Sequence, residues 1–325
     1  MSNLQTDQQA VAEQNRLMHF PVSFFSIVMG LSGLTLAWKV AGQAVPASVS
    51  FMLMLFTSVV MTIIAVFYGA KWWFYPKAVL HELRHPVRIN FFPAFSISLL
   101  LLSVAWQTNT QVAFGLWLCG AVIQFCLTLY VMSSWIHHTH YTLSHANPSW
   151  FIPVVGNIIV PISGTHFGYI ELSWFFFSIG IVFWLALLTI VLYRLFFHEP
   201  LPARMTPMLF ILLAPPSVGF VSYSSLVGGL DNFGRILYYI ALFLSLLLFS
   251  NVLRFIRIPF FISSWAYSFP VAALTIATKK MFLFTASPFF NVLFTGLISV
   301  LSFLVLWLVV RTCKAVIAGE LCRPE

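Results

Sequence analysis

Two histidines and a glutamate near residue 80 have the spacing of a zinc protease site. His81, Glu82 and His85 fit the pattern H-E-x-x-H, in which both histidines bind zinc and the glutamate acts as the base. Pro86 follows at once, no third ligand motif lies downstream, and basic residues crowd the segment (Lys77, Arg84 and Arg88). We therefore interpret the segment as a loop that leads into a proline-started helix. An intramembrane metalloprotease is the alternative.

A second group of histidines lies in the connection after residue 136. His137, His138, His140 and His145 share a stretch that contains no lysine or arginine. Histidine-rich tracts bind metals or sense pH, because imidazole titrates near neutral pH. We interpret this stretch as a solvated loop, with metal binding or pH tuning as the alternative. The sequence predicts no resident metal and no cofactor.

The acidic residues avoid the apolar stretches of the chain. Of the eight, only Glu171 touches such a stretch, at its end. Proton- and cation-coupled transporters commonly need an ionisable group inside the membrane, and lysine and arginine are absent from the centres of these stretches too. A pore through them would therefore have no fixed charge at depth. The basic residues are dispersed without interleaved aromatics, which argues against nucleic acid as a partner.

The elements that position these residues are predicted to be membrane-spanning helices. Apolar residues make up 60% of the 325 positions and charged residues only 7%, against about 45–50% and about 25% in soluble domains. A spanning helix needs about 20 apolar residues. We predict an all-α integral membrane protein with an N-terminal tail (1–20), one transmembrane domain (21–312) and a C-terminal tail (313–325). Its ten predicted spans are 22–43, 49–72, 91–107, 112–136, 151–165, 170–196, 207–226, 234–254, 259–278 and 289–311.

The positions of lysine and arginine predict the orientation of the spans. If the N-terminus is cytoplasmic, only Lys39, Arg235, Lys279 and Lys280 of the 16 basic residues fall outside. Cytoplasmic connections carry the excess of such residues. We therefore expect both termini in the cytoplasm. Topology alone would place most of the net charge of +8 at the inner face.

The odd-numbered spans differ from the even-numbered ones in composition. Proline within a helix removes a backbone hydrogen bond, and membranes tolerate it beside other helices or a water-filled cavity. Proline, serine, glycine and asparagine gather in the odd spans, which predicts five helical hairpins with the odd helices around a pore. Small and polar residues that merely join helices are the alternative. The predicted pore-lining residues are Ser23, Ser26, Gly30, Pro93, Ser96, Pro153, Asn157, Pro161, Pro215, Pro216, Ser264, Ser268 and Pro270.

Four motifs in order resemble those of a known transport family. They are HPVRINFFP (85–93), NPSWFIPVVGNIIVP (147–161), APPSVGF (214–220) and SSWAYSFPVAALTIAT (263–278). Together, on ten hydrophobic spans over roughly residues 20 to 312, they resemble the tellurite-resistance/dicarboxylate transporter family. That family includes the bacterial TehA proteins and the slow anion channels of plant guard cells. In the family the first histidine of the H-E-x-x-H pattern is dispensable, so His81 looks incidental.

The resemblance implies an architecture and a gate. It implies a homotrimer in which each subunit has a pore formed by the odd helices, with the even helices outside. It also implies that Phe269 plugs this pore. Two positions depart from the bacterial TehA pattern, because Ser26 and Pro270 stand where that pattern has glycine. Both changes bear on the width of the pore and on the stiffness of the gate.

The expected function is conduction of small inorganic or organic anions across the inner membrane of a bacterium, without catalysis. A link to tellurite resistance is a further expectation from the family. The alternative is a proton-coupled carrier for C4-dicarboxylates or oxyanions, in which a histidine or Glu171 would have to carry the proton.

Overall fold

The chain is built from long apolar helices. The computed structural model describes residues 16–42, 46–138 and 141–322, and within them it contains no strand. Eight helices are long and apolar enough to cross a membrane, which makes this a multi-pass membrane protein. They are Val22–Ala41, Ala47–Phe74, Arg88–Ala105, Thr110–His137, Ile170–Phe197, Thr206–Leu226, Asn232–Phe249 and Pro288–Ile317.

Two of the ten predicted spans do not meet that measure. The fifth coincides with η5 (Pro148–Phe151) and α7 (Ile152–Gly164), which together form a shorter apolar helix. The ninth coincides with η7 (Ile262–Tyr267) and α12 (Ser268–Thr285), whose serines and paired lysines lower its hydropathy. Eight spanning helices are therefore the structural finding, and ten crossings remain a prediction.

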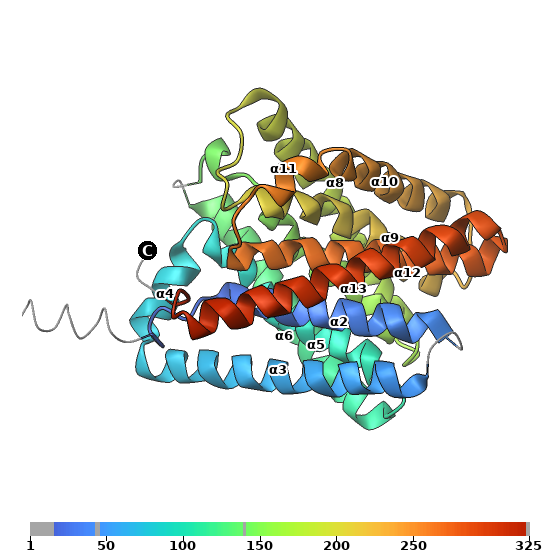
Figure 1. Ribbon diagram of the computed structural model, residues 1–325, viewed down its shortest axis with the longest axis horizontal. Helices are drawn as coiled ribbons and strands as arrows, with labels where there is room; N and C mark the ends of the chain where they lie inside the picture. The colour runs from blue at the N-terminus through green and yellow to red at the C-terminus, as the bar shows by residue number, and fades with distance from the viewer. Residues whose placement is uncertain (1–15, 43–45, 139–140, 323–325) are drawn as a thin grey trace, which may run out of the picture.

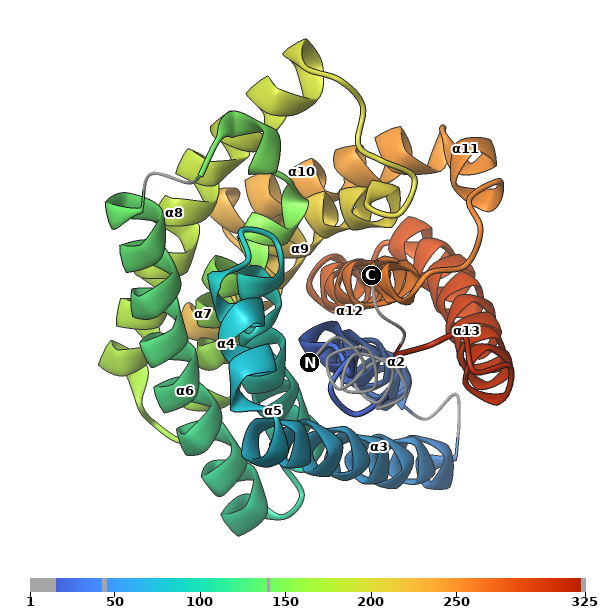
Figure 2. The ribbon, with the colours of Figure 1, turned by 90° about the vertical axis from the view of Figure 1, so that its left-hand side faces the viewer.

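Five helical segments pack against one another in a closed cycle, and we call them the inner helices. Each contacts the next, and the last contacts the first again. Figure 2, which looks along the helices, shows them grouped around the centre of the molecule. In the order of the cycle they are α2 (Phe25–Ala41), α5 (Pro93–Ala105), α7, α9 (Ala214–Leu226) and α12.

The other five long helices pack outside this cycle, and we call them the outer helices. Each packs on the inner helix that precedes it in the chain (Figure 1). In their most apolar windows only 22–33% of outer-helix residues are buried, against 78% in α2, in η3–α5 and in η6–α9. Apolar side chains such as Phe243 and Phe303 remain exposed there, as on a surface that meets lipid. The outer helices are α3 (Ala47–Phe74), α6 (Thr110–His137), α8 (Ile170–Phe197), α10 (Asn232–Phe249) and α13 (Pro288–Ile317).

Every inner helix begins with a 3-10 turn. These turns also contact one another in a closed cycle, so the inner helices start together at one end of the molecule. Arg16 lies against Gly319, so both ends of the described chain meet there. Three short elements complete the fold: α4 (Pro76–Arg84), α11 (Val252–Ile256) and η4 (Leu143–His145). The turns are η1 (Val22–Phe24), η3 (Arg88–Phe91), η5, η6 (Thr206–Leu213) and η7.

The prolines of the inner helices mark helix starts more often than kinks. Pro93, Pro153, Pro215 and Pro216 lie in the first turn of α5, α7 and α9. A missing N–H costs nothing in the first turn, and the fixed φ angle favours helix entry. Only Pro161 is a proline inside one of these helices. The expectation that the prolines of the odd spans lie within helices and remove backbone hydrogen bonds is therefore corrected, because most of them mark the transition from a 3-10 turn to an α-helix.

Candidate functional site

A small cavity lies where all five inner helices converge. Its volume is about 40 Å³, and a water molecule needs about 10–15 Å³ by this kind of measure, so it holds at most a few waters. Its walls are almost entirely apolar. The lining residues are Ser26 and Met29 from α2; Phe91, Ala94 and Ile97 from η3 and α5; Ile152 and Val155 from α7; Ile211 and Ala214 from η6 and α9; and Trp265, Ala266, Phe269 and Pro270 from η7 and α12.

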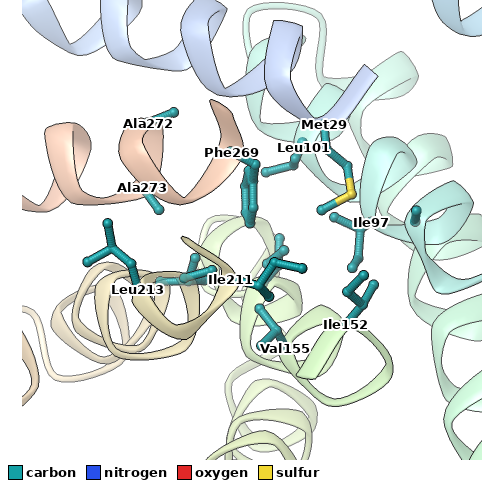
Figure 3. Packing of buried hydrophobic residues seen from close by; sticks show 14 of the residues in the cluster. Met29, Ile97, Leu101, Ile152, Val155, Ile211, Leu213, Phe269, Ala272 and Ala273 are labelled. Carbon is teal, nitrogen blue, oxygen red and sulfur yellow. The ribbon is translucent and has the colours of Figure 1, made fainter. Parts of the chain in front are cut away.

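Phe269 projects into this convergence point from the first turn of α12. Figure 3 shows its ring beside Met29 and Ile97, with Ile211 below the ring. Only 6% of the residue is exposed. Its position where the inner helices converge distinguishes it from the phenylalanines that pack between an inner and an outer helix.

The backbone behind Phe269 is held by close packing and two hydrogen bonds. A Cβ atom on Gly30 of α2 would overlap the Ser268 side chain, and one on Gly33 would meet the Ala272 Cβ atom at 2.6 Å. The Ser268 hydroxyl donates to the Trp265 carbonyl over 2.6 Å. The Trp265 indole N–H donates to Thr312 of α13 over 2.9 Å. Inner and outer helices together therefore fix the start of α12.

Only part of the predicted pore-lining set lies at this cavity. Ser26 and Pro270 of this set line it, together with the predicted gate Phe269, and the Ser26 hydroxyl donates to the Ser23 carbonyl over 2.6 Å. Gly30 and Ser268 pack against each other beside it. The remaining predicted residues do not line the cavity. They are Ser23, Pro93, Ser96, Pro153, Asn157, Pro161, Pro215, Pro216 and Ser264.

Three of these residues instead join α5, α6 and α7 through Gln124. The Ser96 hydroxyl donates to Gln124 Oε1 over 2.7 Å, and Gln124 Nε2 donates to the Pro153 carbonyl over 2.7 Å. Thr128 also donates to that carbonyl and accepts from Asn157 Nδ2. The Asn157 Oδ1 atom is buried without a hydrogen-bond partner. This network holds the side chains of Ser96, Gln124, Thr128 and Asn157 between helices. Apart from Asn157 Oδ1, it supplies the partners that buried polar groups need.

The residues that form most of the cavity carry no polar signal in the sequence. Met29, Ile97, Ile152, Val155 and Ile211 are indistinguishable in type from core residues elsewhere. Trp265 lies in the SSWAYSFP motif, four residues before Phe269. Only this spacing of about one helical turn from Phe269 could have indicated that Trp265 lines the cavity.

The H-E-x-x-H segment forms an ion pair. Glu82 Oε2 lies 3.1 Å from Lys71 Nζ, with both side chains at most 3% exposed, and it accepts from the Tyr68 hydroxyl over 2.9 Å. His81 is exposed, and His85 Nδ1 accepts from the backbone N–H of Val87 over 3.2 Å. The glutamate thus serves as the partner of a buried cation, which would be costly to leave unpaired.

The histidine-rich connection is partly described. His137 and His138 each place Nδ1 near a backbone carbonyl of α6, and His145 Nδ1 accepts from the Thr142 N–H over 3.2 Å. His140 lies outside the described residues. Within the described ranges no group of three or more His, Cys, Asp or Glu side chains is placed to hold a metal ion.

Charged groups lie at both ends of the inner helices. The end with the 3-10 turns gathers helix N-termini, which carry partial positive charge, and it is flanked by basic residues such as Arg88 of η3. At the opposite end lies Asp231, the N-cap of α10. The Gly234 N–H donates to this carboxylate over 2.9 Å, and this bond, with one from the Tyr223 hydroxyl, lowers the pKa of Asp231 below its usual value.

Comparison with known proteins identifies the family. Residues 19–313 match the SLAC1 family, described as voltage-dependent anion channels. An uncharacterized transporter of Methanocaldococcus jannaschii is 27% identical over 96% of this chain and 99% of its own length. The S-type anion channel SLAH3 of Arabidopsis thaliana is 30% identical over 91% of this chain, which spans about half (48%) of that protein. A tellurite resistance protein TehA homolog of Haemophilus influenzae is 27% identical over 78% of this chain and 79% of its own length.

The family match covers nearly all of the inner and outer helices. It agrees with the resemblance carried by the four sequence motifs, which lie at the starts of α5, α7, α9 and α12. This chain therefore belongs to the SLAC1 family of voltage-dependent anion channels.

Proposed function

We propose that this protein is an anion channel whose pore follows the axis of the five inner helices and is closed by Phe269. One observation carries the proposal: the cavity at which all five inner helices converge has the Phe269 ring in its wall. A pore on this axis would have no fixed charge at its narrowest point, because none of the lining residues is ionisable.

An apolar plug at this point would stop ions by preventing hydration. An anion must lose water to pass a dry constriction, and polar or charged groups are costly to desolvate without replacement partners. Hydrophobic constrictions are a recognised means of gating. The edge of a phenyl ring carries partial positive charge and its face partial negative charge. A ring that rotates to present its edge would therefore repel an anion less than one that presents its face. Movement of Phe269 would then open the path.

The charges at the end of the path with the 3-10 turns favour anions over cations. Five helix N-termini converge at the end with the 3-10 turns, and partial positive charge there attracts anions. Several hydroxyls of the inner helices, such as those of Ser98 and Ser217, donate to the backbone carbonyl four residues earlier in the chain. The hydrogen atoms of these hydroxyls are therefore already used in bonds to the backbone. We expect the helix dipoles to contribute more to anion selectivity than free hydroxyl donors do.

The wider assignment follows the same family. We propose small inorganic or organic anions as permeant ions, the inner membrane of a bacterium as the location, and cytoplasmic termini. We further propose a homotrimer with one pore in each subunit. The likeness to a tellurite resistance protein TehA homolog supports a link to tellurite resistance as one physiological role.

Anion flux into proteoliposomes tests the proposal. Purified wild-type protein, Phe269→Ala and the control Phe290→Ala would be compared for chloride, nitrate and malate uptake. Phe290 of α13 is equally buried, at 6% exposure, but packs on Tyr238 away from the cavity. We expect faster flux for Phe269→Ala alone. Saturable uptake driven by a pH gradient in all three proteins would instead support the proton-coupled carrier.

A further inference from the structure

The parallel inner helices create an electrostatic difficulty for an anion. Because all five begin at one end, their C-terminal ends gather at the other. Each helix C-terminus carries partial negative charge, equivalent to about half an elementary charge at its unpaired carbonyls. An anion that is attracted at the first end would therefore be repelled at the second, unless positive groups compensate.

Lys39 supplies one such group at the boundary between α2 and α5. It lies in the last turn of α2, and its Nζ atom donates to the carbonyls of Val104 (2.9 Å) and Ala105 (3.0 Å). These are the last two residues of α5. The ammonium group of one inner helix thus covers the C-terminal carbonyls of its neighbour in the cycle.

Lys280 repeats this arrangement at the boundary between α12 and α9. Its Nζ atom donates to the Val221 carbonyl (3.0 Å) and to the hydroxyls of Ser224 (2.9 Å) and Ser225 (2.8 Å). All three acceptors belong to the last two turns of α9, which ends at Leu226. Two unrelated positions in the chain therefore place a lysine from one inner helix on the C-terminal end of another.

Within the described part of the chain, the neighbouring residue Lys279 does not contact the C-terminal end of another inner helix. Its Nζ atom lies 5.0 Å from the ring centres of both Phe282 and Phe294, and Phe294 belongs to the outer helix α13. Lys279 carries the same charge as Lys280 and lies next to it in α12, at nearly the same position along the helix axis. It differs in facing an outer helix, which makes it a matched control.

We propose that Lys39 and Lys280 are specificity-determining residues of the channel. They neutralise the partial negative charge of helix C-termini at the mouth of the pore opposite to the 3-10 turns. This inference rests on the proposed anion conduction. It assigns the mouth opposite to the 3-10 turns a positive compensation without which the helix C-termini would repel anions there.

Single-channel recording in the open Phe269→Ala background tests this inference. Lys39→Gln and Lys280→Gln keep hydrogen-bond donors but remove the charge, and Lys279→Gln is the control. In about 20 mM NaCl we expect each of the first two to lower chloride conductance about twofold, the factor for one unit charge acting about 10 Å away in water. The loss should shrink at 1 M salt, where the Debye length is about 3 Å. The chloride-to-sodium permeability ratio should fall as well.

The possible outcomes distinguish failure of the role of the two lysines from failure of the proposed anion conduction. Lys280→Arg should retain the conductance and permeability ratio of the background, which excludes a loss caused by misfolding. An equal effect of Lys279→Gln, or unchanged permeability ratios in Lys39→Gln and Lys280→Gln, would overturn the role of the two lysines while leaving the channel itself established. Absence of current in the Phe269→Ala background would instead contradict the proposed function.

Discussion

Gly30 of α2 lies so close to Ser268 of α12 that a methyl group on the glycine would overlap the serine side chain. The same surface of α2 brings Gly33 against Ala272 one turn later. Ser268 directly precedes Phe269, so this contact sets the distance between α2 and the residue that we propose as the gate. The two glycines are therefore required for close approach of the helices.

Gly30→Ala should disturb this contact. We expect a loss of about 1–3 kcal/mol in the free energy of unfolding, the usual range for overpacking, together with altered gating because Ser268 must move. Thermal unfolding in detergent and anion flux would measure the two effects. Gly296→Ala on α13 is the control, because no atom lies within 4 Å of its added Cβ and alanine favours helix. Equal stability of both variants would contradict the close packing.

Gln124 is the hub of the buried network between α5, α6 and α7. Gln124→Leu removes its buried hydrogen bonds to Ser96 and to the Pro153 carbonyl. Each lost bond costs about 0.5–1.5 kcal/mol, so the melting temperature should fall clearly. Gln111→Leu, at an exposed position on the same helix, should leave it almost unchanged. A Gln124→Leu protein as stable as wild type would show that the network contributes nothing.

The buried pair of Lys71 and Glu82 joins α3 to α4. Glu82→Gln should cost about 3–5 kcal/mol, because Lys71 would be left as a buried charge without its counter-ion. Lys71→Met should be similarly destabilising, and the double variant should recover part of the loss, so the double-mutant cycle yields a coupling energy. Glu199→Gln, at an exposed site, is the control.

Treatment with a chelator distinguishes an ion pair at Glu82 from a metal site. If His81 and His85 held a zinc ion, with Glu82 as the base, a chelator would lower the melting temperature of the wild-type protein. We expect chelators to leave the melting temperature unchanged. A stoichiometric metal in the purified protein would contradict this expectation.

The sequence carries much of the helix arrangement but less of the site. Hydropathy places the long outer helices well, because lipid-facing residues must be apolar along their whole length. It places α7 and α12 less well, since a helix surrounded by protein can be short or carry Ser264, Ser268 and Lys280. The distinct composition of odd and even spans matches their difference in burial.

The cavity could be predicted only in part. Phe269 was indicated by the family motif, and Ser26 and Pro270 line the cavity with it. Ser96 and Asn157 looked suitable for a pore by residue type, but a serine or asparagine serves equally to join helices, as both do around Gln124. Met29 and Ile97 could not be predicted, because an apolar side chain on an apolar helix carries no record of which way it faces.

The role of proline also depends on its position within a helix. The sequence predicts that Pro93 and Pro153 lie within their spans and remove a backbone hydrogen bond, yet they occupy the first turns of α5 and α7, where no such bond is lost. The hydropathy of a membrane span does not mark where its 3-10 turn gives way to α-helix, so the sequence alone could not distinguish a helix start from a kink.

Planar-bilayer recording of Phe269→Ala beside wild type and Phe290→Ala tests the central claim most directly. In asymmetric chloride we expect Phe269→Ala to give large currents whose reversal potential lies near that of chloride, while wild type and Phe290→Ala stay nearly closed. Reconstituted protein of normal stability that gives the same current for all three variants would contradict a gate at Phe269 on the axis of the inner helices.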